Sequence, residues 1–173
     1  MIYVLAYPEF EPVVADSIAR FRVAHEPERA KRVRPHITLM FGLRSAHPLE
    51  FVAVCEQVAE RSPKIAVEFA SSEVVYDPFE KTHKLFLMVS AGKGELIALH
   101  ERLYEGPHRS ELAFDAPYRP HMTIATHRHR AIVEKLEVAD IGPFPVHGTI
   151  EALEVVELAN NTLHSLGTIT LQT

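Results

Sequence analysis

The sequence predicts a single α+β domain in which one structural unit occurs twice, and three observations indicate this. The pattern Arg-Pro-His-apolar-Thr-apolar begins at Arg34 and returns at Arg119. Apolar runs typical of strands alternate with segments of helical periodicity, in the same order in both halves. Corresponding features lie about 80 to 85 residues apart throughout the chain.

The first unit begins with an apolar run at residues 2–7, which predicts a buried strand. Residues 11–24 carry apolar side chains at helical spacing and predict a helix. Pro35 keeps Arg34 out of the helical conformation and marks the start of the first motif strand. A helix and two strands are then predicted, in that order, at residues 48–60, 65–69 and 73–76.

The second unit repeats this order. A strand is predicted at residues 84–89, a helix at 93–105 and the second motif strand after Pro120. A helix and two strands follow at residues 129–137, 146–150 and 154–157. Asn160-Asn161 predicts a turn into a last strand at residues 162–172, which closes a hairpin.

Length and composition are those of one compact domain spanning residues 1–173. The chain is 47% hydrophobic and 24% charged, which is typical of globular proteins that bury a substantial core. Residues 1–7 are apolar but lack the basic region and cleavage site of a signal peptide, and no apolar run approaches 18 residues. We therefore expect a cytoplasmic monomer with no membrane association. The single cysteine, Cys55, lies at an apolar position and is predicted to be a buried thiol without a catalytic role.

The formal net charge of −5 argues against a protein that coats long nucleic acids, because such binding depends on many Lys and Arg contacts with phosphates. A small nucleotide or an RNA end needs only local positive charge. Arg29, Lys31, Arg32 and Arg34 supply such charge immediately before His36. This cluster is either a solvated basic face or part of a phosphate-binding surface.

The two motifs bring chemically useful side chains to one face of each strand. Side chains alternate between faces of a strand, so His36 and Thr38 project together, as do His121 and Thr123. Two imidazoles can serve as general base and general acid, and hydroxyl groups can bind phosphoryl oxygens, without a metal or cofactor. A phosphoester is the substrate that suits this set.

Two H-x-T-x motifs on apolar strands, half a chain apart, resemble the two-histidine phosphoesterase superfamily. Its members include RNA 2′,3′-cyclic phosphodiesterases and the so-called 2′-5′ RNA ligases. Phe41-Gly42 after the first motif and Tyr118 before the second also fit the family. The similarity in motif order and spacing covers nearly the whole chain.

This resemblance implies a bilobal, pseudo-symmetric fold of largely antiparallel sheets flanked by helices, with the active-site cleft between the lobes. Carried over to this sequence, it implies that His36 and His121 are the catalytic pair. Thr38 and Thr123 would bind the phosphate.

Other residues near the motifs are candidates for substrate binding. Arg34 and Arg119 precede the motif prolines, where each either forms a surface salt bridge or steers a phosphate. Aromatic rings could stack on a base, and Tyr118 and Phe79 are the candidates. The apolar neighbours of Phe41 predict that it lies in the core.

No metal is expected. His127 and His129 have a spacing that could hold a metal, yet no nearby cysteine or acidic cluster completes a coordination set. A surface turn is the better interpretation.

These observations predict a metal-independent phosphodiesterase that hydrolyses a 2′,3′-cyclic phosphate at an RNA or nucleotide end. One alternative is reversible 2′-5′ RNA ligation, which uses the same groups in reverse. Another is a non-catalytic RNA- or nucleotide-binding module, although pure binding does not need two proton-transfer groups. The pseudo-symmetry leaves open which histidine is the acid and which the base.

Overall fold

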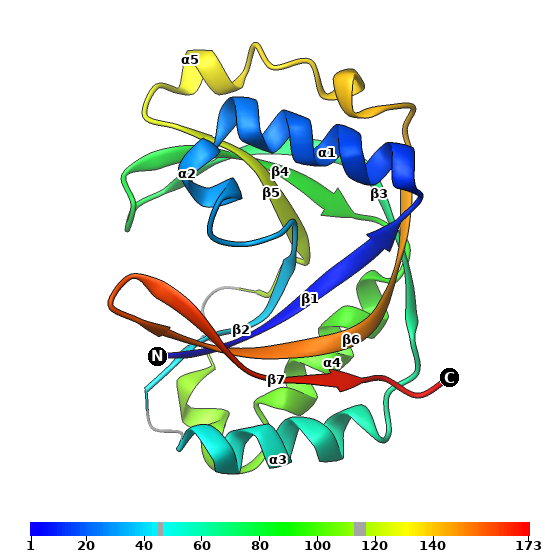
Figure 1. The fold of residues 1–173 in the computed structure, drawn as a ribbon, viewed down its shortest axis with the longest axis vertical. Coiled ribbons are helices and arrows are strands. Elements are labelled where there is room, and N and C mark those ends of the chain that lie inside the picture. Colours follow the sequence, from blue (N-terminus) through cyan, green and yellow to red (C-terminus); the bar gives the residue numbers. More distant parts are fainter. Residues whose placement is uncertain (45–46, 113–116) are drawn as a thin grey trace.

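The computed structural model describes residues 1–44, 47–112 and 117–173. Within these residues seven strands form one strongly curled sheet, and helices cover its two ends (Figure 1). Every pairing between neighbouring strands is antiparallel, which confirms the α+β class with largely antiparallel sheets.

The strands are β1 (Ile2–Phe10), β2 (Ile37–Leu43), β3 (Ile65–Asp77), β4 (Thr82–Val89), β5 (His121–His127), β6 (Val146–Ala159) and β7 (Thr162–Thr170). The α-helices are α1 (Pro12–His25), α2 (Pro27–Ala30), α3 (Pro48–Ala59), α4 (Lys93–Leu103) and α5 (Arg130–Val133). Two short 3-10 helices are η1 (Gly106–Glu111) and η2 (Val138–Ile141).

The long strand β6 holds the sheet together. One edge of β6 pairs with β1, and the other pairs first with β3 and then, beyond Ile150, with β7. The strand order β1-β2-β5-β4-β3-β6-β7, with β1 also paired to β6, makes the sheet curl back on itself. β2 and β5 meet at the centre of this curl through the pair Ile37 and Met122.

The two lobes interleave the two sequence units. α1 belongs to the first unit but packs on β5 of the second, and α4 of the second unit packs on β2 of the first. Figure 1 shows α1 and α5 above the sheet and α3 and α4 below it. Each lobe is therefore covered by a helix from the opposite unit, and the two motif strands lie between the helical layers.

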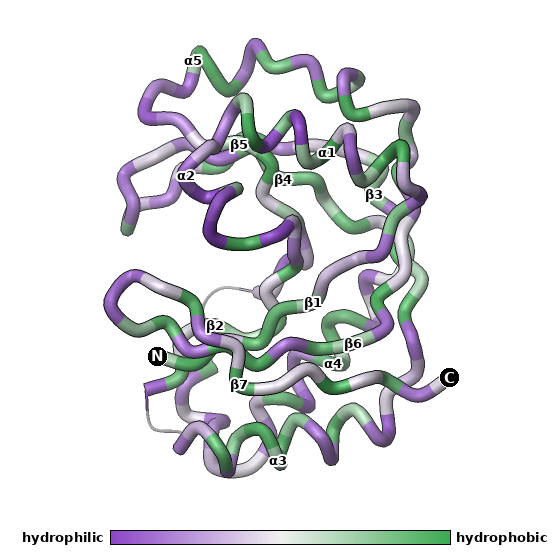
Figure 2. The backbone as a smooth tube through the Cα atoms, viewed as in Figure 1, coloured by the Kyte–Doolittle hydropathy of each residue, from purple (hydrophilic) through white to green (hydrophobic). Residues whose placement is uncertain are grey.

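Burial follows the periodicity of each element. On α4, Leu96, Leu99 and Leu103 are buried at three- and four-residue spacing. On the motif strands the apolar residues next to the motif histidines and threonines, Ile37, Leu39, Met122 and Ile124, are buried, whereas Thr38, His121 and Thr123 alternate with them and are half-buried. Figure 2 shows this distribution as hydrophobic stretches along β1 and α3 and a hydrophilic segment through α2.

Most predicted elements are confirmed within a few residues, and two predictions need correction. The strand pairs predicted at 65–69 and 73–76, and at 146–150 and 154–157, are each one continuous strand, β3 and β6. The helix predicted at 129–137 is much shorter, because only Arg130–Val133 is α-helical.

The hairpin prediction is confirmed, since Asn160 and Asn161 both have the positive φ angles of a tight β6–β7 turn. Cys55 is a buried free thiol, as predicted. No helix in the described part of the chain has the length and apolar character needed to cross a membrane.

Candidate active site

The pairing of β2 with β5 brings the two motifs together. Ile37 lies opposite Met122, and both side chains are fully buried. In an antiparallel pair, the residues on either side of such a couple also face one another, and they project to the opposite surface. This register sets Thr38 across from His121, and His36 across from Thr123, on the side of the strands away from the core.

Both imidazole rings are anchored in the same way. Nδ1 of His36 lies 2.8 Å from the carbonyl oxygen of Arg34, and Nδ1 of His121 lies 2.6 Å from that of Arg119. A carbonyl oxygen only accepts, so Nδ1–H is the donor and the neutral ring carries its proton there. Nε2 is then the atom that accepts or releases a proton in each histidine.

The surroundings of the two rings favour their neutral forms. Burial lowers the pKa of His36 to about 4, and the nearby charges of Arg29 and Arg22 act in the same direction. Burial likewise lowers the pKa of His121, with added repulsion from Arg119. The larger effect is at His36, so the two histidines differ despite their similar anchoring.

The two histidine rings also have different aromatic partners. The ring of Phe86 stacks on His121 with centroids 3.7 Å apart, while Tyr7 meets His36 edge-on at 6.1 Å. The Phe86 contact was not predicted, because Phe86 lies on β4 and reaches His121 only through the β4–β5 pairing.

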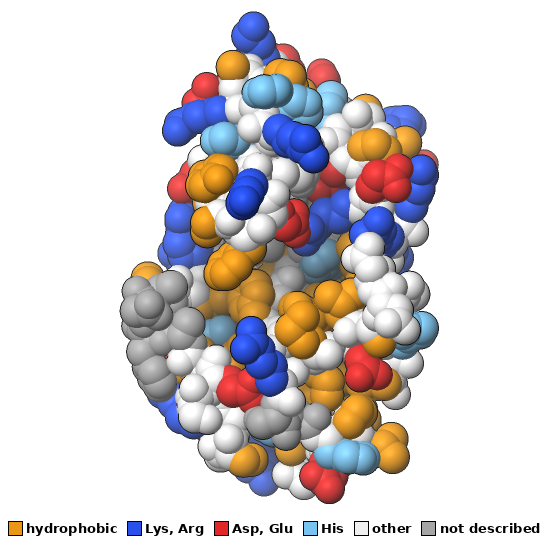
Figure 3. All heavy atoms as spheres, turned by 90° about the vertical axis from the view of Figure 1, so that its left-hand side faces the viewer, with side chains coloured by type: hydrophobic (Ala, Val, Ile, Leu, Met, Phe, Trp, Pro, Cys, Tyr) orange, Lys and Arg blue, Asp and Glu red, His pale blue; other side chains and the backbone are white. Residues whose placement is uncertain are grey.

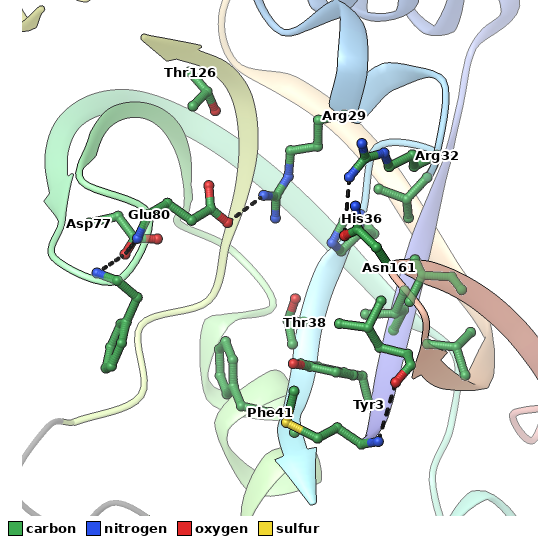
Figure 4. Close-up of a pocket in the computed structure, with 18 of the residues that line it drawn as sticks. Tyr3, Arg29, Arg32, His36, Thr38, Phe41, Asp77, Glu80, Thr126 and Asn161 are labelled. Atoms are coloured by element: carbon green, nitrogen blue, oxygen red, sulfur yellow. Dashed lines mark hydrogen bonds and ion pairs between the residues drawn. The ribbon is translucent and has the colours of Figure 1, made fainter. Parts of the chain in front are cut away.

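A cleft of about 1010 Å³ opens beside the first motif. In Figure 4, Thr38 and His36 lie on one side of it, with Arg29 above them and Asp77 and Glu80 across the opening. Figure 3 looks into this hollow, where hydrophobic side chains gather below Lys and Arg side chains. His121 and Thr123 are not among the described residues that line the cavity, and they lie beside it on β5.

The arginines adjacent to the motifs have partners of their own. The Arg34 guanidinium lies 4.2 Å from the centre of the Tyr7 ring. Arg119 forms an ion pair with Glu73, in which Nη1 and Oε1 are 3.3 Å apart. A surface salt bridge is one of the two roles that the sequence leaves open for Arg119.

The basic residues that reach the cleft lie earlier in the predicted cluster. Arg29 and Arg32 line the cavity, and each contacts a different hairpin. Arg29 Nη1 lies 3.2 Å from Glu80 Oε1 on the β3–β4 turn. Arg32 Nη1 donates to Asn161 Oδ1 on the β6–β7 turn over 3.3 Å (Figure 4). The segment around α2 thus connects both hairpins at the mouth of the cleft.

The aromatic candidates occupy different places. Phe79 is 95% exposed on the β3–β4 turn and lines the cleft. The prediction that Phe41 lies in the core is wrong, because this ring is 48% exposed and also lines the cleft. A bulge in the β1–β2 pairing near Met40 disturbs the simple alternation on which that prediction depended.

Tyr118 contacts the backbone of the first motif strand and helps to hold it in place. One face of its ring stacks on His100 at 3.9 Å, and its hydroxyl donates to the Thr38 carbonyl over 2.9 Å. His100 Nδ1 donates to the Leu39 carbonyl over 2.6 Å. These bonds satisfy β2 carbonyls where β2 diverges from β5, so they help to position the motif.

A second supporting network is buried beside the cleft. Arg22 and Glu26 form a buried ion pair, and Arg22 Nη1 donates to the Val33 carbonyl over 2.9 Å. Thr126 of β5 donates to the other Glu26 oxygen over 3.1 Å. This network joins the end of α1 to β5 and to the segment that leads into His36. In the sequence, this network is indicated only by Arg22, a charged residue on the apolar face of the predicted helix.

No group of three or more His, Cys, Asp or Glu side chains in residues 1–44, 47–112 and 117–173 is arranged to hold a metal ion. The His129 backbone N–H donates to His127 Nδ1 over 3.0 Å, as in a local turn.

Similarity to known proteins extends over most of the chain. The family model of the 2′-5′ RNA ligase superfamily matches residues 10–162. A search of curated protein sequences gave no match.

Several solved structures share the fold. TT0787 of Thermus thermophilus is 22% identical, with a TM-score of 0.63 and 98% of each chain covered. Escherichia coli LigT complexed with 3′-AMP is 17% identical, with a TM-score of 0.63, 99% of this chain and 98% of LigT covered. Kluyveromyces marxianus Usb1 is 9% identical, with a TM-score of 0.55, 99% of this chain and 97% of Usb1 covered.

Proposed function

The chain belongs to the 2′-5′ RNA ligase superfamily, and we propose that it is a metal-independent phosphodiesterase that hydrolyses 2′,3′-cyclic phosphates at RNA or nucleotide ends. Membership supports phosphoesterase or ligase-type activity in general. The cyclic phosphate, the lack of a metal requirement and the catalytic residues are our proposal.

The observation that carries this proposal is the matched anchoring of two neighbouring imidazoles. His36 and His121 each donate from Nδ1 to the carbonyl two residues earlier, which leaves both Nε2 atoms for proton transfer. Two such atoms on adjacent strands are what an in-line displacement at phosphorus needs, because the attacking and leaving oxygens lie on opposite sides of the phosphorus atom.

We assign the base to His36 and the acid to His121. His36 has the more strongly lowered pKa and is therefore the histidine that stays neutral. Its Nε2 takes a proton from water as the water oxygen bonds to phosphorus. The bond from phosphorus to one ribose oxygen breaks, and His121 Nε2 donates a proton to that oxygen, so the product is an open phosphomonoester.

The bound phosphate completes this arrangement. Its negative charge raises the pKa of a neighbouring imidazole, so binding of the substrate favours protonated His121. The hydroxyls of Thr38 and Thr123, on the same face as the histidines, donate to the non-bridging oxygens. The apolar part of the cleft, which includes Phe41 and Leu5, suits the nucleoside.

Incubation with a 2′,3′-cyclic mononucleotide, followed by separation of the products, tests the proposal. We expect one nucleoside monophosphate, either the 2′ or the 3′ isomer, which His36→Ala should form about 10²–10⁴-fold more slowly. The exposed His164→Ala variant is the matched control and should behave as the unmodified protein. Joining of RNA ends without hydrolysis would indicate a ligase. Binding without any turnover would indicate a non-catalytic module.

A further inference from the structure

The carboxylate of Glu80 bridges two cations at the mouth of the cleft. Its Oε1 atom lies 3.2 Å from Arg29 Nη1 on α2, and its Oε2 atom lies 3.1 Å from Lys84 Nζ on β4. All three residues line the same cavity as His36. The cations belong to different elements, so Glu80 joins α2 to β4 at the cleft through one hydrogen-bonded ion pair and one further ion pair.

Lys84 and Asp77 form the fixed part of this cluster. Lys84 Nζ lies 2.6 Å from Asp77 Oδ2, and the Lys84 side chain is only 8% exposed. The other Asp77 oxygen accepts the backbone N–H groups of Phe79 and Glu80 over 2.8 and 3.1 Å. Asp77 therefore holds both the lysine and the turn in place.

Glu80 is the replaceable member of the cluster. Its side chain is 48% exposed, and in the described part of the chain its carboxylate contacts Arg29 and Lys84. A half-exposed ion pair contributes little net stability, so moving this carboxylate into solvent has a small cost.

Arg29 has hydrogen-bonding capacity that Glu80 does not use. A guanidinium group offers five N–H donors in a planar fork that suits a phosphate. In the described part of the chain, Arg29 Nε is buried without a hydrogen-bond partner. An unsatisfied buried donor is costly, and an anion that takes two bonds from this fork would offset that cost.

We propose that Arg29 and Lys84 form a second phosphate subsite, which the Glu80 carboxylate occupies until substrate binds. The ligand is a phosphate on the 5′ side of the nucleoside whose cyclic phosphate lies at the histidines. A phosphodiester carries one negative charge on two free oxygens, as a carboxylate does, so it replaces Glu80 without changing the charge of the cluster. This subsite deepens the proposed function and rests on it for the identity of the substrate.

The size of the cleft supports this subsite. A cavity of about 1010 Å³ is at the upper end of the range for sites that hold one drug-sized molecule. In Figure 4 the Arg29 guanidinium lies between Glu80 and the His36 and Thr38 pair. A nucleotide at the histidines therefore has room to extend towards Arg29.

Three substrates test the subsite in kinetics. They are a nucleoside 2′,3′-cyclic phosphate, the same compound with a 5′-phosphate, and a dinucleotide that ends in the cyclic phosphate. The readout is the ratio of kcat/KM for each extended substrate to that for the plain one. A preference for both indicates an internucleotide site, and a preference for the 5′-phosphate alone indicates a site for a terminal phosphate.

Two variants and one control identify the residues responsible. Arg29→Gln should lower the ratio about tenfold or more, because a charge-assisted bond to the phosphate is lost. Glu80→Gln should raise it about threefold or more, since a neutral amide is easier to displace. Lys31→Gln removes the same charge from the same segment and should leave the ratio unchanged, because Lys31 is exposed and pairs with Glu28.

Equilibrium binding separates this inference from the proposed function. Calorimetry should show that a nucleoside 5′-monophosphate binds more tightly than the nucleoside, and that Glu80→Gln widens the difference. This result would stand even if the plain cyclic phosphate were not hydrolysed. Hydrolysis with equal ratios in the unmodified protein and Glu80→Gln would overturn the subsite and leave the proposed function intact.

Discussion

The lowered pKa of His36 leads to a specific expectation for the pH dependence of the reaction. Burial holds this imidazole neutral, with a pKa of about 4 instead of the usual value near 6.5. A base with a lowered pKa remains functional in acid, and its activity is lost only as the pH falls through that lowered value. The acid limb of kcat/KM, which reports the free enzyme, should therefore lie well below pH 6.5.

The size of the effect follows from the two pKa values. At pH 5 a base of pKa 6.5 is neutral in about 3% of molecules, whereas a base of pKa about 4 is neutral in about 90%. The structure thus implies about 30-fold more activity at pH 5 than an unperturbed imidazole base allows. The pKa of His121 is also lowered. The bell-shaped pH profile of the rate should therefore have its maximum at a lower pH than two unperturbed histidines would give.

The assay uses the His121→Ala variant, whose residual rate isolates the titration of His36. We expect a single acid limb and no alkaline limb, and the imidazole resonance of His36 should titrate at the same pH in NMR spectra. His164→Ala, which changes an exposed histidine, should keep the bell-shaped pH profile of the unmodified protein. A midpoint near pH 6.5 would refute the dominance of burial. A single alkaline limb would show that His36 is the acid.

Further expectations concern the proton-transfer groups, the metal and the support of the motif strand. His36→Ala and His121→Ala should each lower turnover by about 10²–10⁴-fold, and the double variant should be far less than multiplicatively worse. Thr38→Ala should lower turnover less than the histidine variants do, because only an uncharged hydrogen bond is lost. Steady-state rates as low as those of the histidine variants would contradict this. Hydrolysis should be unchanged by EDTA, whereas abolition with rescue by a divalent cation would mean that the histidines bind metal. Tyr118→Phe should lower the free energy of unfolding in urea by about 1 kcal/mol, because the Thr38 carbonyl loses its donor. The exposed Tyr76→Phe is the control, and equal midpoints for both variants would argue against this support.

The repeated motif, the matching order of strand and helix patterns and their constant spacing were sufficient to predict the fold class and the two motif strands. Strand periodicity puts every second side chain on one face, so the grouping of His36 with Thr38 follows from local geometry alone. Pro35 and Pro120 marked where these strands begin, and Asn160-Asn161 marked the turn that the structure confirms. Such features depend on the backbone preferences of a few neighbouring residues, which a sequence displays directly.

Features that depend on residues distant in the chain were not predictable from sequence. Phe86 reaches His121 through strand pairing, and Tyr118 and His100 reach β2 from other elements. The cluster of Arg29, Glu80 and Lys84 unites residues from α2, a turn and β4.

The sequence by itself determined which residues we propose as proton-transfer groups, because the two H-x-T motifs are local patterns. Only the tertiary structure decided their pKa values, since desolvation depends on what covers a side chain. It also decided which basic residues reach the cleft, placing Arg29 there and pairing Arg119 with Glu73. Periodicity describes the direction of a side chain from its own backbone, whereas burial and charge pairing are set by parts of the chain that folding brings together.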